Sequence, residues 1–87
     1  MKPSAEDFRR ALDELLKAGE ELGLEAVEIT AGHLHRRVGG YPDNNHRMPV
    51  CCSVMRQAVA SGDVVVREPP SGLGATLTIR YRLPRPR

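Results

Sequence analysis

The chain has 87 residues and a net charge of +2, and its residues are 40% hydrophobic but only 3% aromatic. This length and composition are typical of one domain with a modest, aliphatic core. No apolar run approaches the ~20 residues that a membrane-spanning helix needs, and residues 1–4 do not resemble a signal peptide. We therefore expect a single cytoplasmic domain over residues 1–87, without membrane contact.

Charge is divided unevenly along the chain. Residues 1–28 carry four cationic side chains and eight carboxylates, a net charge of −4, whereas residues 29–87 carry nine arginines and three carboxylates, a net charge of +6. Such asymmetry is one indication of nucleic-acid contact. It predicts an acidic N-terminal element and a basic remainder.

The first predicted helix covers residues 4–22. Ser4 and Asp7 have the spacing of a capping box, and Gly23 ends the helix. Apolar residues recur at helical spacing along one face; they are Phe8, Leu12, Leu15, Leu16 and Leu22.

A short strand and a second helix follow. Residues 26–29 alternate apolar and polar side chains, which predicts a strand. Thr30 is the expected cap of a helix over residues 30–38, in which Leu34 and Val38 point to the core. Gly39 ends this helix, and residues 41–43 form a loop.

The third predicted helix, residues 46–60, has a helical apolar stripe that includes Val50 and Val54. Asn44 and Asn45 are the expected caps at its start. Pro49 fits because it lies in the first turn, where its missing N–H is not needed. Gly62 is the expected stop.

Two C-terminal strands are predicted, over residues 64–68 and 75–83, with a turn-rich connection between them. In the second strand Ile79 and Tyr81 lie on one face, and Arg80 and Arg82 on the other. The tail, residues 84–87, is expected to be frayed. The predicted core joins these elements; it comprises Leu12, Leu15, Leu34, Val38, Val50, Val54, Ile79 and Tyr81.

The cysteines and histidines do not have the spacing of a metal site. Adjacent cysteines such as Cys51 and Cys52 cannot form an unstrained disulfide and are poorly placed to chelate one ion. We interpret Cys51 as a core residue and Cys52 as a half-exposed one, both free thiols. His33 and His35 lie on opposite sides of their short helix. No pair of acids or activated nucleophile is evident, so we expect no enzyme, metal or cofactor.

The order helix, strand, helix, helix, strand, strand resembles the winged-helix family, an α+β fold. Residues 30–60 resemble its helix-turn-helix, and residues 64–83 resemble its β-hairpin wing. Two departures are the loop over residues 39–44, which exceeds a 3–4-residue turn, and Pro49 at the start of the recognition helix. The stretch 34–49 also resembles small uncharacterised bacterial proteins, a likeness that implies no function.

The resemblance implies binding to double-stranded DNA, with the third helix in the major groove. Asparagine can pair with adenine and arginine with guanine, which makes residues at the start and along the exposed face of this helix candidate base readers. They are Asn44, Asn45, His46, Arg47, Ser53, Arg56 and Gln57. The candidate phosphate contacts are Arg36, Arg37, Arg67, Arg80 and Arg82.

A second interpretation stays open. Outward arginines on a strand are commonly a solvated surface, and asparagines before a helix commonly cap it. The same winged helix could serve as a protein interaction module whose basic face meets an acidic partner. In the DNA-binding interpretation, the acidic first helix is expected not to touch DNA and to be the surface for a second copy or another partner.

Overall fold

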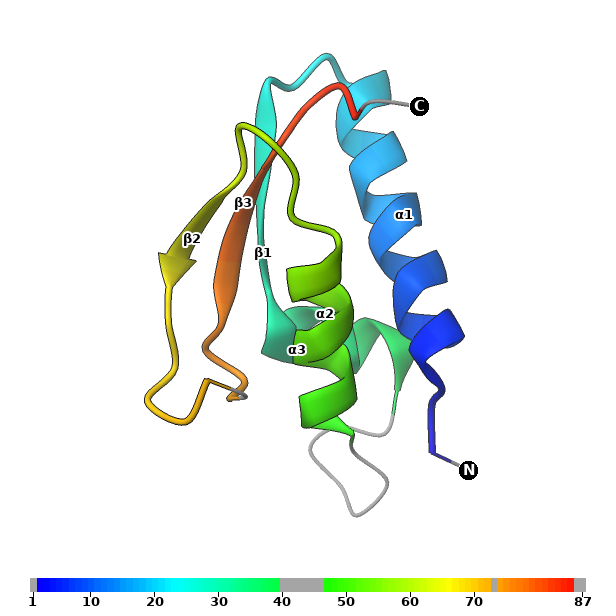
Figure 1. The fold of residues 1–87 in the computed structure, drawn as a ribbon. Coiled ribbons are helices and arrows are strands. Elements are labelled where there is room, and N and C mark those ends of the chain that lie inside the picture. The colour runs from blue at the N-terminus through cyan, green and yellow to red at the C-terminus, as the bar shows by residue number, and fades with distance from the viewer. Residues whose placement is uncertain (1, 40–46, 73, 86–87) are drawn as a thin grey trace.

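A computed structural model describes residues 2–39, 47–72 and 74–85. In this part of the chain three helices pack against a three-stranded antiparallel sheet (Figure 1). The elements are α1 (Ala5–Glu21), β1 (Ala26–Thr30), α2 (Ala31–Val38), α3 (Met48–Gln57), β2 (Val64–Arg67) and β3 (Thr78–Arg82). The sheet order is β1-β3-β2, so β1 and β2 are the edge strands. The predicted α+β class and the predicted order of elements are confirmed.

Side-chain caps fix the starts of α1 and α2. Ser4 Oγ accepts a hydrogen bond from Asp7 N at 3.2 Å, and Asp7 Oδ2 accepts one from Ser4 N at 2.8 Å. Thr30 is the last residue of β1 and also the N-cap of α2, where its hydroxyl accepts from His33 N at 3.2 Å. Both predicted caps are therefore confirmed. Each cap satisfies a backbone donor that the first helical turn leaves free.

Helix α3 is shorter than the prediction of residues 46–60. Its N-cap is Arg47, which makes no side-chain capping bond. The predicted caps, Asn44 and Asn45, lie outside the described residues. Pro49 does lie in the first turn. The helix ends at Gln57 because the following residues form a separate turn. In that turn Asp63 Oδ2 accepts from Ala60 N at 2.8 Å.

Gly62 belongs to this turn and does not end the helix. Its φ of +92° lies in the region that favours glycine. A Cβ at this position would lie 2.7 Å from Arg82 Cδ. The glycine therefore allows the turn between α3 and β2 to lie close to the Arg82 side chain at the end of β3.

Strand β3 is shorter than the predicted residues 75–83. The residues just before it form hydrogen bonds with the start of α2 instead of with β2. The carbonyl of Leu77 accepts from Ala31 N at 2.8 Å, and that of Ala75 accepts from Gly32 N at 2.9 Å. These two bonds satisfy backbone donors at the start of α2. Strand β2 likewise ends one residue before the predicted Glu68.

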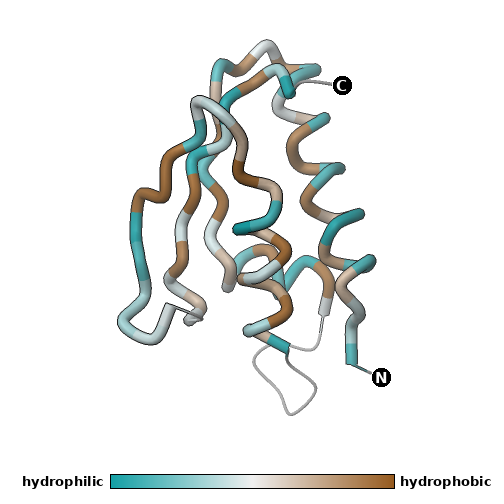
Figure 2. The backbone as a smooth tube through the Cα atoms, viewed as in Figure 1, coloured by the Kyte–Doolittle hydropathy of each residue, from teal (hydrophilic) through white to brown (hydrophobic). Residues whose placement is uncertain are grey.

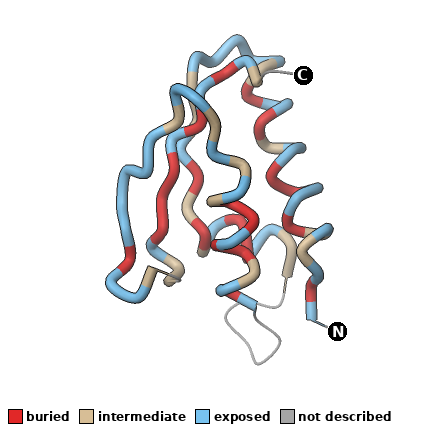
Figure 3. Tube along the Cα trace, in the orientation of Figure 1, coloured by how far each residue is buried: buried red, intermediate tan, exposed pale blue. Residues whose placement is uncertain are grey.

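The core lies between the helices and one face of the sheet. Figure 2 shows hydrophobic residues lining this interior, and Figure 3 shows that the same segments are buried. Tyr81 is fully buried, and its hydroxyl donates to Met55 O at 2.9 Å, which ties β3 to α3. Of the predicted core, the buried members are Leu12, Leu34, Val54, Ile79 and Tyr81, and the partly buried ones are Leu15, Val38 and Val50.

Both cysteines are fully buried, so the prediction of a half-exposed Cys52 is wrong. Cys52 Sγ lies 3.4 Å from Gly74 O, and Cys51 Sγ lies 3.5 Å from Ala31 O. The hairpin residues before β3 cover the side of α3 on which Cys52 lies. A helical pattern cannot show this cover, because it comes from residues far along the chain.

Neither cysteine is expected to react with a thiol reagent in the folded protein at pH 8. Burial, with the neighbouring Cys52 thiol, raises the pKa of Cys51 to about 12, and burial also raises the pKa of Cys52. The thiolate is the reacting species. Absorbance of the released chromophore should show no fast phase before denaturant is added, and two thiols per chain afterwards. One fast thiol in the folded chain would contradict this arrangement.

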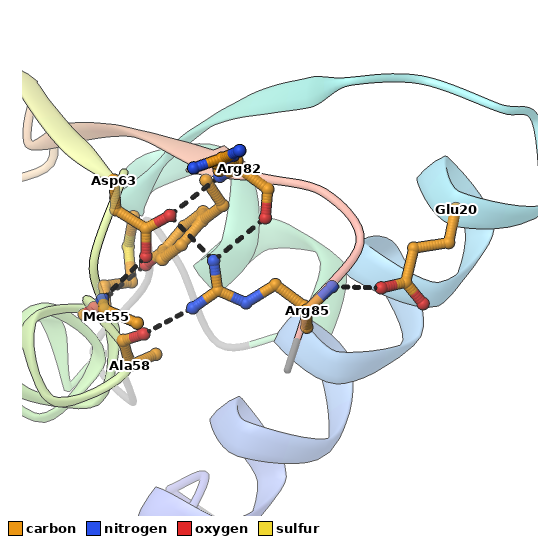
Figure 4. Close-up of polar contacts among 8 residues, drawn as sticks. Glu20, Met55, Ala58, Asp63, Arg82 and Arg85 are labelled. Carbon is orange, nitrogen blue, oxygen red and sulfur yellow. Dashed lines mark hydrogen bonds and ion pairs between the residues drawn. The ribbon is translucent and has the colours of Figure 1, made fainter. Parts of the chain in front are cut away.

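The C-terminal tail is anchored as far as Arg85, which corrects the prediction of a frayed segment (Figure 4). The Arg85 guanidinium donates to Asp63 Oδ1 at 2.7 Å, Ala58 O at 2.8 Å and Arg82 O at 3.1 Å. It also lies over the Tyr81 ring, 5.4 Å from the centroid. Arg85 therefore joins the end of α3, the turn before β2 and the end of β3. Residues 86 and 87 lie outside the described part.

Candidate nucleic-acid interface

Arg56 is held against the hairpin. Its guanidinium forms an ion pair with the Glu68 carboxylate through both terminal nitrogens, and it also donates to Gly72 O at 2.6 Å. These contacts fix the loop after β2 against α3. Arg56 thus positions the hairpin, whereas the sequence interpretation made it a base reader.

Arg80 and Arg82 lie in the sheet, away from the start of α3. In the strand register Arg80 stands between Glu28 and Val64, and Arg82 stands opposite Ala26 at the end where β1 begins. The start of α3 lies at the opposite end, where β1 passes into α2 (Figure 1). These two arginines therefore belong to a different surface from Arg47.

Three cationic side chains surround a groove between the N-terminal half of α1 and the end of α2. They are Lys2, Arg10 and Arg37, and the carboxylates of Asp7 and Glu14 line the same groove. The backbone hydrogen bond from Ser4, with that from the Ser4 side chain, holds the pKa of Asp7 below its ordinary value. The Asp7 carboxylate is thus already used in the cap of α1, and it also forms an exposed ion pair with Arg10 at 3.9 Å.

Lys2 and Arg10 were missed by sequence reasoning, which expected the acidic first helix to avoid DNA. The net charge of α1 conceals the local arrangement, since most of its carboxylates lie further along the helix. The fold brings the end of α2 to the start of α1. The signal in the sequence was a pair of cations, Lys2 and Arg10, on either side of the α1 cap.

Arg47 is exposed and stands at the start of α3. Its backbone N–H donates to Nε2 of the buried His35 at 2.7 Å, which attaches this end of α3 to α2. The neighbouring Arg36 and Arg37 are exposed in the last turn of α2. We name the surface formed by Lys2, Arg10, Arg36, Arg37 and Arg47 the basic end.

The remaining predicted positions lie elsewhere in the chain. Ser53 and Gln57 are exposed and line a shallow groove between α3 and α1, together with Arg9. Arg67 is exposed in β2. Asn44, Asn45 and His46 lie outside the described residues, next to the basic end in the sequence.

Within residues 2–39, 47–72 and 74–85, no three His, Cys, Asp or Glu side chains are grouped to hold a metal ion. None of the helices described there is both long enough and apolar enough to cross a membrane. Comparisons with protein families, characterised proteins and solved structures find no match for this chain. The winged-helix resemblance therefore stays a prediction from the order of its elements.

Proposed function

We propose that this chain is a winged-helix domain that binds double-stranded DNA, as a small regulator or as the recognition component of a larger system. The order of elements and a sheet of order β1-β3-β2, with a hairpin beside α3, support the winged-helix assignment. Fold alone does not establish function, so the proposal depends on the surface at which α3 begins.

The observation that carries the proposal is the convergence of cations at the basic end. Lys2, Arg10 and Arg37 line one groove, and Arg47 begins the helix that is attached to α2 through His35. These side chains come from the segment before α1, from α1, from the end of α2 and from the N-cap of α3. They suit the phosphates on either side of a groove. Arg47 is then the candidate base reader, since arginine pairs with guanine through two hydrogen bonds.

The hairpin has a smaller role in this arrangement than the resemblance implies. Residues 68–77 contain no lysine or arginine, and their one carboxylate, Glu68, is paired with Arg56. The loop can follow the DNA backbone without repelling it, but it adds no cationic contact. Most of the electrostatic affinity should come from the basic end.

Titration of a mixed-sequence duplex at several salt concentrations tests the proposal. Each neutralised phosphate contributes about −0.9 to the log–log salt slope. Contacts from Lys2, Arg10, Arg37 and Arg47 therefore predict a slope of about −3.6 and a roughly 10²-fold loss of affinity between 50 and 200 mM salt. Arg37→Gln should make the slope shallower by about 1 for every duplex. Arg80→Gln removes another exposed arginine, from the sheet, and should leave the slope unchanged.

Sequence preference is a separate measurement. Arg47→Ala should change which duplex is preferred, at a cost of about 1–3 kcal/mol at one base pair. If the unmodified chain shows no salt-sensitive binding to any duplex at low ionic strength, the DNA-binding function is wrong. An unchanged slope for Arg37→Gln, with a shallower one for Arg80→Gln, would move the interface to the sheet.

Protein contact is the second candidate function, and one observation favours it. Glu28 stands beside Arg80, and Glu68 is paired with Arg56, so carboxylates interrupt the basic surface predicted from the sequence. The exposed acidic side of α1 remains our proposed surface for a second copy or another partner. An absence of DNA binding would leave this function as the proposal.

A further inference from the structure

Strand β2 exposes three consecutive valines. The exposed fractions are 53% for Val64, 38% for Val65 and 50% for Val66, whereas most large apolar side chains of the described chain are buried. Figure 2 colours this strand as hydrophobic where Figure 3 colours it as exposed. β-Branched side chains suit strands, but leaving three of them in water gives up the free energy of burial.

The backbone of β2 is open to pairing on one side. The strand is at the edge of the sheet, where one row of N–H and C=O groups has no neighbouring strand among the described residues. Its partner residues on β3 are Arg80 for Val64, Ile79 for Val65 and Thr78 for Arg67, so Val66 forms a bulge. The strand contains no proline or lysine, two of the residues by which edge strands commonly resist added strands.

Charges around β2 select the kind of partner. Asp63 precedes the strand and is paired with Arg85, and Glu68 follows it and is paired with Arg56. Both flanking carboxylates are thus neutralised within the chain. Arg67, the cation of the strand itself, forms no ion pair with another described residue, whereas Arg80 on the neighbouring β3 stands opposite Glu28. The edge is therefore apolar and, through Arg67, cationic.

The short length of β2 favours an added peptide segment over a second folded copy as its partner. A specific interface between folded proteins takes about 20–30 residues from each partner, and β2 offers four. An added strand instead binds through main-chain hydrogen bonds and alternate side chains, which a short edge supplies. We propose that β2 is a docking edge for an extended segment of a protein partner in which apolar residues alternate with acidic ones.

Two capped seven-residue peptides test this inference on the intact chain, one alternating valine with glutamate and the other valine with lysine. The glutamate peptide should shift the backbone amide resonances of residues 63–68 and bind about fivefold more tightly than the lysine peptide, since opposite charges on neighbouring strands attract. Arg67→Glu should reverse this preference. Val66→Ser, which removes an apolar contact without adding a charge, should weaken the binding of the glutamate peptide. Val59→Ser, which changes an exposed valine outside the strand, should leave that binding unchanged.

Three results would overturn the docking edge. Equal affinity for the two peptides, both in unmodified protein and in Arg67→Glu, would show that charge does not select the partner. Resonance shifts confined to other surfaces would show that the peptides do not bind at β2. A concentration-dependent dimer that Val66→Ser abolishes would assign the edge to a second copy. The inference does not depend on DNA binding, because these measurements contain no nucleic acid.

Discussion

Arg85→Met is expected to lower the free energy of unfolding by about 3 kcal/mol at pH 7. Asp63 has no exposed side-chain surface, and the Arg85 side chain is only 11% exposed, so the substitution leaves a buried carboxylate without its cation. Breaking such a pair from one side costs about 3–5 kcal/mol. The lower end applies here because the backbone N–H groups of Ala60 and Arg82 still donate to Asp63.

Urea unfolding of four variants separates the ion pair from general damage to the tail. Arg9→Met removes a cation from the exposed Arg9–Glu6 pair and should cost less than 1 kcal/mol. The double variant Asp63→Asn with Arg85→Met should be less destabilised than the sum of its single changes, because neither then leaves a buried charge unpaired. A loss below 1 kcal/mol for Arg85→Met would contradict the anchored tail.

Acid should remove the same stabilisation. Burial alone raises the pKa of Asp63, but hydrogen bonds from Arg85 and from the two backbone N–H groups outweigh it, and that pKa lies below the ordinary 3.8. A carboxyl whose pKa is lowered on folding contributes stability above its unfolded pKa and loses it as the pH falls through its folded pKa. The difference between the unmodified chain and Arg85→Met should therefore be full at pH 7 and should narrow below about pH 4.

Phe8→Ala is expected to cost about 3–5 kcal/mol, the usual loss when a buried phenylalanine is truncated. Phe8 is fully buried on α1, and its ring meets the His35 ring edge-on, with centroids 4.8 Å apart. Domains of this size are stable by only roughly 4–13 kcal/mol, so the change removes a large share. The matched control is Leu22→Ala, at a side chain that is 76% exposed, which should shift stability by less than about 0.5 kcal/mol.

The urea midpoint and its slope measure this loss. A cost below 1 kcal/mol for Phe8→Ala would mean that α1 does not pack against α2 through this ring. Because His35 also accepts from Arg47 N, we expect the same substitution to disturb the start of α3. The backbone amide resonances of Arg47, Met48 and Val50 should report that disturbance.

Local signals in the sequence predicted those parts of the fold that depend on neighbouring residues. The capping box at Ser4 and Asp7, the cap at Thr30 and the face shared by Ile79 and Tyr81 depend only on spacing, and all appear in the structure. The length of α3 could not be predicted in the same way. It is set by a turn in which Asp63 bonds Ala60 N.

Features that depend on residues far apart in the chain could not be predicted from the sequence. Cys52 is buried by contact with Gly74, and Arg85 is ordered by Asp63, each across more than 20 positions. The candidate site shows the same division. Arg47 was identified from its place before α3, whereas Lys2 and Arg10 became candidates only when the fold set them beside the end of α2.

The hydrogen bonds at the start of α2 have a consequence for how the chain folds during synthesis. An eight-residue helix is only marginally stable in isolation, and the Ala31 and Gly32 N–H groups bond the carbonyls of Leu77 and Ala75. A ribosome releases Ala75 and Leu77 well after α2, and Arg85 later still. We therefore expect the nascent chain to stay incompletely folded until Arg85 has emerged, and α2 to be among the last helices to gain protection.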